Sequence, residues 1–151
     1  MTFEDAKTLA TIAGPCIAIL ALVVSGMAFW QARRSMRAQT FLAALKLAED
    51  IKLSKWMDFI RRLRVTSYSA FLATATADEQ LGVRSIIDYF NQIGHLVRHG
   101  YLTKNHVVHI YWASLRDIEA RLLPWWLAGF RTANGQPWYY ITFEWLVKEA
   151  I

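Results

Sequence analysis

A single apolar run dominates the hydropathy pattern of the first third of the chain. It begins after Lys7 and ends at Trp30, and the one ionisable side chain inside it is that of Cys16. At about 1.5 Å per residue, a helix over this run covers the ~30 Å hydrocarbon core of a membrane. A core helix of a soluble protein normally carries a polar stripe, which this run lacks. The pattern predicts a transmembrane helix over residues 8–32, after a short extracytoplasmic tail at 1–7.

A cleaved signal peptide is the main alternative for this run. Such a peptide has a positively charged start, a shorter apolar core and a small-residue cleavage site. Here the start contains Glu4 and Asp5, and the segment 31–34 (QARR) is a poor cleavage site. We therefore expect an uncleaved anchor.

Positive charge follows the run. Residues 31–64 carry nine Lys or Arg against three acidic residues, whereas 65–151 are balanced. Cytoplasmic flanks of membrane helices are enriched in Lys and Arg, so Arg33, Arg34 and Arg37 predict a cytoplasmic C-terminal part. The expected location is the bacterial inner (cytoplasmic) membrane, single-pass, with the N-terminus outside.

Small residues recur along one face of the predicted span. Gly14, Ala18, Ala21 and Ser25 are spaced four, three and four residues apart. Small residues at such spacing let two membrane helices approach closely. The seam therefore indicates a homo-oligomer, although alanine is also common in membrane helices that do not associate.

Residues 33–65 are rich in helix-forming residues and lack Gly and Pro, which predicts a basic juxtamembrane helical region. The apolar phase shifts near Ser54, which predicts a bend or a new helix capped there. This region also carries a basic-aromatic set, namely Lys52, Lys55, Arg61, Arg62 and Arg64 with Trp56 and Phe59. Such a set is compatible with nucleic-acid binding. Because the rest of the domain is neutral, a charged face near anionic lipid headgroups is the preferred interpretation.

The remaining chain predicts helices only. The Ser/Thr/Ala-rich segment 66–77 has the composition of a linker, and 78–151 of a helical cytosolic domain. Pro137 is expected in the first turn of the last helix. Apolar residues at helical spacing predict the core as Phe90, Ile93, Val97, Tyr111, Leu115, Ile118 and Leu122. The fold class is therefore all-α, with a single transmembrane helix that continues into a small cytosolic helical bundle.

A resemblance rests on residues 88–100 (DYFNQIGHLVRHG), on Arg131 and on residues 143–146 (FEWL). At these positions the chain resembles a family of short uncharacterised bacterial proteins. Members of that family have one N-terminal membrane span and a small helical domain of unknown function. The resemblance covers most of the chain. It implies membrane anchorage and a helical cytosolic domain, and it implies no established reaction.

The candidate chemistry is sparse. No nucleophile motif, phosphate-binding glycine loop or zinc-protease motif occurs, so no catalytic residue is assigned and a non-enzyme is expected. The histidines fall in two pairs, His95 with His99 and His106 with His109. These are weak metal candidates, because their helical phase lies off the apolar stripes.

One ion pair is predicted within the helical domain. Glu144 lies among aromatic residues, where a carboxylate needs a partner, and Arg131 precedes the last turn. Their pairing would tie the last helix to the preceding one. The tryptophans of this region are expected in the core or at interfaces, although a ligand pocket among them is also compatible with the pattern.

Two functions from different classes fit these features. The first is a non-enzymatic helical adaptor or scaffold, anchored at the cytoplasmic face, that self-associates or holds a membrane-associated protein partner. The second is a membrane effector of stress or antiviral defence whose cytosolic domain senses a nucleotide or nucleic acid. Neither requires a cofactor, and the bilayer is a partner in both.

Overall fold

The computed structural model describes the backbone of residues 3–150 and the side chains of residues 17–150. Within these ranges the chain forms helices and no strand, so the all-α prediction is confirmed there. The chain divides into two compact units between Gln39 and Thr40. Helix α1 (Phe3–Asp50) runs through this boundary. The two units are described separately below.

In the first unit, which ends at Gln39, the described residues belong to α1 and include its apolar part and the basic residues that follow it. A segment within Ile17–Asp50 is long and apolar enough to cross a membrane, and none of it is buried. The exposed side chains include Leu22 at 73% and Phe29 at 71% exposure. The helix already begins at Phe3, so residues 3–7 of the predicted extracytoplasmic tail are helical.

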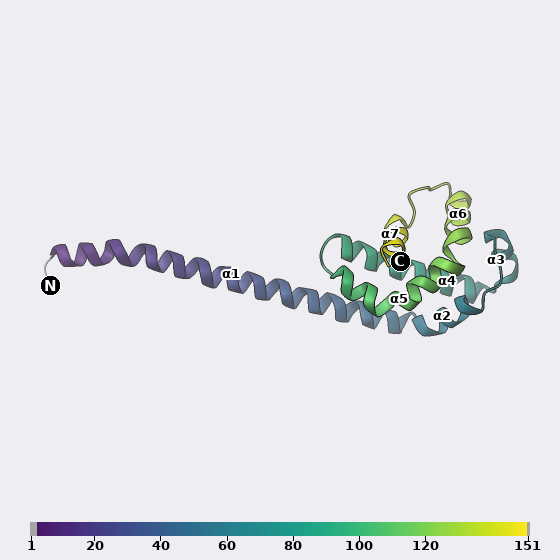
Figure 1. The fold of residues 1–151 in the computed structure, drawn as a ribbon, viewed down its shortest axis with the longest axis horizontal. Coiled ribbons are helices and arrows are strands. Elements are labelled where there is room, and N and C mark those ends of the chain that lie inside the picture. Colours follow the sequence, from purple (N-terminus) through teal and green to yellow (C-terminus); the bar gives the residue numbers. More distant parts are fainter. Residues whose placement is uncertain (1–2, 151) are drawn as a thin grey trace. The chain divides into compact units, whose positions relative to one another are not determined.

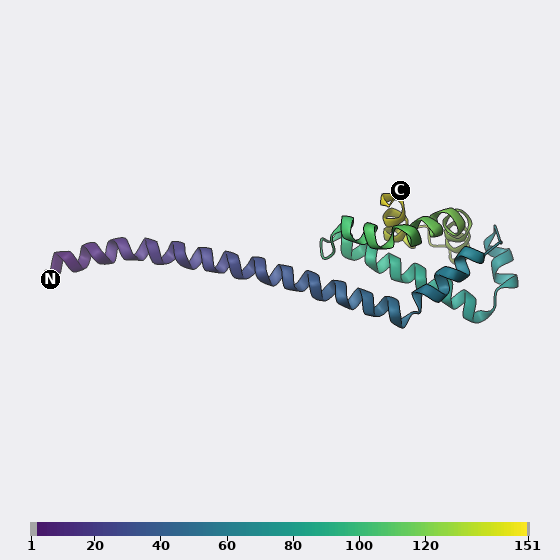
Figure 2. The ribbon, with the colours of Figure 1, turned by 60° about the horizontal axis from the view of Figure 1, so that its bottom comes forward.

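The second unit contains the end of α1 and six further helices (Figures 1 and 2). Helix α2 (Leu53–Arg62) follows Lys52, whose φ of 53° lies in the left-handed region. This residue turns the chain, and α2 then buries Trp56, Met57 and Ile60. A break near this point was expected, but Ser54 lies inside α2 and does not cap it.

The segment 66–77 is not a plain linker, because it contains α3 (Tyr68–Thr74). Ser67 caps this helix, since its Oγ accepts a hydrogen bond from the backbone N–H of Ala70 at 3.2 Å. The helix buries Phe71. Burial of one large aromatic side chain outweighs the modest helix propensity of serine and threonine.

Helices α4 (Ala77–Arg98) and α5 (Lys104–Arg121) are joined by a tight turn and run beside each other in both views (Figures 1 and 2). Thr76 and Glu79 form a capping box at the start of α4. Gly100, at φ 73°, takes the left-handed conformation that follows many helix ends. The predicted core residues are buried, namely Phe90, Ile93, Val97, Tyr111, Leu115, Ile118 and Leu122.

Helices α6 (Leu123–Asn134) and α7 (Ile141–Glu149) complete the unit. Pro137 lies in the turn before α7 rather than in its first turn, so that expectation is wrong. Tyr140 immediately precedes α7 and takes a left-handed backbone at φ 60°. Of the helix pairs in this unit, α4 and α7 are the most extensively packed.

Candidate functional site

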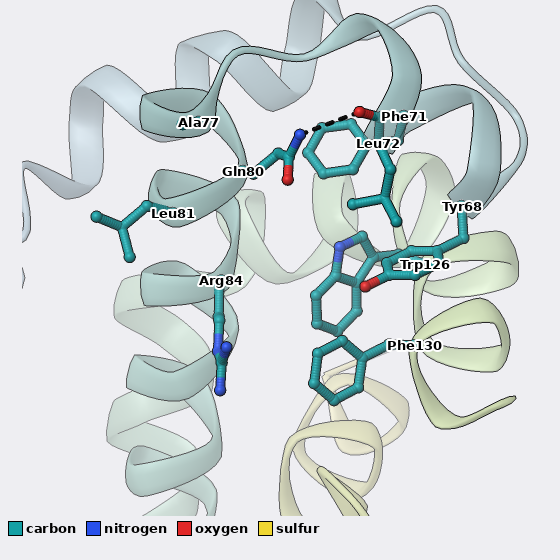
Figure 3. Close-up of a pocket in the computed structure, with 9 residues that line it drawn as sticks. All are labelled: Tyr68, Phe71, Leu72, Ala77, Gln80, Leu81, Arg84, Trp126 and Phe130. Carbon is teal, nitrogen blue, oxygen red and sulfur yellow. Dashed lines mark hydrogen bonds between the residues drawn. The ribbon is translucent and has the colours of Figure 1, made fainter. Parts of the chain in front are cut away.

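The candidate site is a pocket of the second unit that lies between α3, α4 and α6 (Figure 3). Its volume is about 280 Å³. Helices α3 and α6 supply aromatic side chains and Leu72, and α4 supplies Gln80 and Arg84 beside two aliphatic side chains. The lining residues are Tyr68, Phe71, Leu72, Ala77, Gln80, Leu81, Arg84, Trp126 and Phe130.

Aromatic rings form one wall of this pocket. Trp126 and Phe130, four residues apart on α6, stack with ring centroids 4.7 Å apart and planes inclined by 13°. Tyr68 meets both rings edge to face, at 6.0 and 6.2 Å. Gly129 permits this approach, because a Cβ there would lie 2.1 Å from the Cβ of Tyr68. The sequence thus builds a flat, preformed apolar surface.

Gln80 contributes a hydrogen-bond acceptor, its side-chain oxygen. Two hydrogen bonds made by the nitrogen of the same amide hold this oxygen in place. Its Nε2 donates to the backbone oxygens of Leu72 at 3.1 Å and Ala75 at 2.9 Å. Both bonds fix the amide, and its Oε1 makes no hydrogen bond to the described residues. In Figure 3 this oxygen points away from the α3 backbone and toward the pocket.

Trp126 contributes a donor. The residue is only 3% exposed, but its indole N–H makes no hydrogen bond to the described residues, and since no buried side-chain nitrogen or oxygen there lacks a partner, this N–H reaches solvent. Figure 3 shows the nitrogen on the side of the ring that faces Gln80. The neighbouring Trp125 differs, because its N–H donates to the carbonyl of Arg121 at 2.7 Å. The Trp126 N–H is therefore a donor that a ligand in the pocket can use.

Arg84 brings positive charge to the pocket. Its guanidinium carbon lies 5.8 Å from the centroid of the Phe130 ring. Its Nε is 3.9 Å from Oδ2 of Asp88, a loose contact one turn further along α4. The other carboxylate oxygen, Oδ1, accepts a hydrogen bond from the Tyr140 hydroxyl at 2.7 Å. Burial, and then this bond to Asp88, raise the pKa of Tyr140 and keep it protonated.

A second polar contact joins α4 to α7. The side-chain oxygen of Asn91 accepts hydrogen bonds from the backbone N–H of Phe143, at 3.1 Å, and from the Thr142 hydroxyl. The Thr142 hydroxyl is also 3.1 Å from the carbonyl oxygen of Asn91. The amide oxygen thereby satisfies an otherwise unpaired N–H at the start of α7. The role of this contact is structural.

Arg131 and Glu144 meet between α6 and α7. The Arg131 Nη2 lies 2.9 Å from Glu144 Oε2, and its Nε donates to the carbonyl of Tyr139 at 2.9 Å. Lys148 approaches the other carboxylate oxygen at 2.8 Å. Hydrogen bonds from Lys148 and Arg131 outweigh burial and lower the pKa of Glu144. This fully paired carboxylate ties the last helix to the domain.

The four histidines are all exposed. The rings of His95 and His99 lie 4.2 Å apart, whereas His106 packs against Phe41 at 5.5 Å. Within the part of the chain that the structure describes, no three His, Cys, Asp or Glu side chains are placed to share a metal ion.

The basic residues fall into two groups. Arg33, Arg34 and Arg37 are exposed beside Trp30 in the first unit, and the Arg34 guanidinium lies 5.6 Å from the Trp30 ring centroid. In the second unit, Lys55 pairs with Asp78 at 3.2 Å. Arg61 pairs with Asp117 at 2.7 Å and with Asp58 at 3.0 Å. Part of the basic-aromatic set is therefore neutralised by carboxylates.

The small-residue seam lies on an exposed helix. Ala18, Ala21 and Ser25 are exposed in the first unit. Gly14 falls outside the residues whose side chains the structure describes.

The sequence left open a ligand pocket among the tryptophans, and Trp126 lines this one. It did not indicate the α3 side of the pocket, because the segment that supplies Tyr68 and Phe71 looked like a linker. Two local signals would have found it. Ser67 begins a short helix, and Thr76 with Glu79 has the spacing of a capping box, which fixes where α4 starts. Those boundaries place Gln80 and Arg84 one turn apart on the face of α4 toward α6.

The amino-acid sequence matches one model in a comparison with protein families. A family model described as a domain of unknown function (DUF4760) matches residues 9–150. The chain belongs to the DUF4760 family. The DUF4760 match includes the apolar helix, the pocket and the residues 88–100 on which the resemblance rests. No curated protein and no solved structure matches the chain.

Proposed function

We propose that this DUF4760 protein is a non-enzymatic helical adaptor or scaffold, anchored at the cytoplasmic face of a bacterial membrane. The observation that carries the proposal is the exposure of the apolar part of α1. Between Ile17 and Trp30 its large side chains are 55–73% exposed. A helix so apolar on every side needs a lipid environment or a partner helix.

The basic residues after this stretch support the orientation. Arg33, Arg34 and Arg37 are exposed at the end of the apolar stretch, while only Lys7 is basic before it. This asymmetry favours an outside N-terminus and a cytoplasmic second unit. The guanidinium of Arg34 above Trp30 suits the headgroup region, where aromatic and cationic side chains gather.

A topology assay in bacterial cells tests the anchor. The full chain is fused at its C-terminus to a fluorescent protein, active in the cytoplasm, or to alkaline phosphatase, active in the periplasm. We expect membrane-bound fluorescence and no phosphatase activity. Phosphatase activity alone would contradict the orientation, and a soluble fusion would contradict the anchor.

A matched pair of charge reversals sharpens the assay. Changing Arg33, Arg34 and Arg37 to Glu removes the asymmetry and should give a mixed orientation. Changing three exposed arginines of the second unit to Glu preserves the charge asymmetry around the apolar stretch. The orientation of this variant should be that of the wild type. The control positions are Arg64, Arg116 and Arg121.

The exposed apolar side chains of the second unit support the adaptor role. Trp112 and Trp138 are 47% and 65% exposed, and Ile110 and Ile141 are also exposed. Exposed aromatic side chains of this size are typical of protein contact surfaces. Native mass measurement of the full chain in nanodiscs should give more than one copy. A single copy that also captures no protein partner would contradict the scaffold role.

The pocket favours a second candidate, a membrane effector that senses a nucleotide. Its aromatic wall, free donor and acceptor, and Arg84 are of the kind that bind small ligands. The effector role predicts that a ligand alters bilayer permeability. Dye release from vesicles that contain the protein, with and without ligand, would separate this candidate from the adaptor.

A further inference from the structure

We infer that the pocket between α3, α4 and α6 binds a flat nitrogen heterocycle that carries an acidic group, with nucleoside monophosphates as the ligand class. The inference concerns the second unit alone, so it does not depend on the adaptor role. It gives the second candidate function a defined site. Four features of the pocket carry it.

The first feature is a complementary pair of unused polar atoms. Trp126 offers an N–H that makes no hydrogen bond within residues 17–150 and is open to solvent, while the rest of the residue is buried at 3% exposure. Gln80 offers Oε1, held in place because its Nε2 donates to two backbone oxygens. One donor and one acceptor match the edge of a nucleobase, which presents an acceptor beside an N–H donor. An aliphatic or purely aromatic hydrocarbon would leave both unpaired.

The second feature is the shape of the apolar wall. Trp126 and Phe130 are stacked within 13° of parallel, and Tyr68 supports them edge-on. Trp126 and Phe130 are buried and their rings are fixed by these contacts. A rigid aromatic wall favours flat ligands, since ring contacts are gained without ordering flexible side chains.

The third feature is the positive charge of Arg84 at the open side of the pocket. The Arg84 side chain is 54% exposed and its contact with Asp88 is long, at 3.9 Å. Because Asp88 Oδ1 already accepts from Tyr140, the carboxylate is shared between two partners. The guanidinium can therefore engage an anion from solvent. Phosphate and carboxylate groups both accept two N–H donors from arginine.

The fourth feature is the size of the cavity. Its volume of about 280 Å³ lies just below the range of roughly 300–1,000 Å³ for small-molecule sites. It accommodates one ring system with a small substituent, and the acidic group then remains at the open side. Single-stranded nucleic acid with several stacked bases does not fit a site of this volume.

Calorimetric titration of the full chain in phosphatidylcholine nanodiscs tests the inference. The probes are AMP, GMP, CMP and UMP, each beside its phosphate-free nucleoside. We expect at least one monophosphate to bind, and to bind more tightly than its nucleoside. The absence of binding by all four at millimolar concentration would overturn the inference. Correct membrane insertion in the same sample separates this failure from failure of the anchor proposal.

Matched variants locate the binding site. Arg84→Gln should weaken the monophosphate about tenfold or more and leave the nucleoside unchanged, because only the anion loses its partner. Arg116→Gln is the control, since Arg116 lies over Trp112 outside the pocket. Equal effects of these two substitutions would overturn the assignment.

A third variant tests the indole donor. Trp126→Phe keeps an aromatic ring but removes the N–H, and it should weaken nucleoside and monophosphate alike, by about tenfold. Unchanged affinity in a variant with normal unfolding temperature would exclude the proposed edge contact. If this variant does not fold, the comparison of Arg84→Gln with Arg116→Gln still decides the location.

Discussion

Gly94 of α4 packs directly against the backbone of Thr142 in α7. A Cβ atom on Gly94 would lie 2.4 Å from the Thr142 carbonyl oxygen and 2.9 Å from its carbonyl carbon. The obstructing atoms belong to the main chain, so no rotamer change can relieve the overlap. The packing of α4 on α7, the most extensive between two helices of this unit, therefore depends on the absence of a side chain at one position.

Gly94→Ala should destabilise the second unit even though alanine is the better helix former. The helix gains up to about 1 kcal/mol from the substitution, whereas the forced separation of α4 and α7 costs roughly 1–3 kcal/mol. Chemical denaturation followed by tryptophan fluorescence measures the difference. Gly26→Ala is the control, because a Cβ there meets no atom within 4 Å. Equal stability of both variants would contradict the contact.

Tyr89 and Tyr111 form a buried hydroxyl pair, with oxygens 2.7 Å apart. Either single substitution to Phe should cost about 1–3 kcal/mol, because it leaves the remaining hydroxyl buried without a partner. The double Phe variant should recover part of that loss. A double-mutant cycle measured by denaturation tests the coupling, and simple additivity of the two losses would show that the hydroxyls act independently.

Glu144 should make stability depend on pH in the acid range. Lys148 and Arg131 lower its pKa in the folded chain, so the carboxylate stabilises the fold above its ordinary value near 4.5. This contribution is lost as pH falls through the folded pKa. Glu144→Gln should therefore cost about 1 kcal/mol at pH 7 and progressively less below pH 4.5. A loss that stays constant down to acid pH would assign the effect to packing instead of charge.

The exposed small-residue seam of α1 should respond to added volume. Ala21→Leu introduces bulk between Ala18 and Ser25 and should reduce self-association, while insertion continues because leucine is favourable in lipid. Crosslinking of the full chain in membranes measures the oligomer. Val23→Leu, on another face of the helix, should change little. Equal crosslinking in both variants would place any self-association in the second unit.

Most of the helices could be predicted because apolar spacing is a local signal. The stripes through Phe90 and Leu115 mark the core correctly, and Gly100 marks the end of α4. The segment 66–77 was misassigned because seven residues form a helix only with tertiary support, and the burial of Phe71 provides that support. Ser54 failed as a cap because Lys52 makes the turn instead.

The candidate site was less predictable than the fold. Its residues come from three helices, and no spacing rule connects Tyr68, Gln80 and Trp126. The unpaired indole N–H of Trp126 is visible only when its neighbours are placed around it. The Arg131–Glu144 pair was accessible to sequence reasoning, because a carboxylate among aromatic residues requires a nearby cation.

The two left-handed residues that are not glycine have opposite consequences for protein engineering. Lys52 is exposed and bears φ 53°, so Lys52→Gly relieves backbone strain of about 1 kcal/mol at little cost. Tyr140 bears the same strain, but its ring packs against Trp126 and Phe130 and its hydroxyl holds Asp88 beside Arg84. Glycine there would relax the backbone and release the carboxylate. A screen for thermal stability would thus accept a change at 52 and reject the same change at 140.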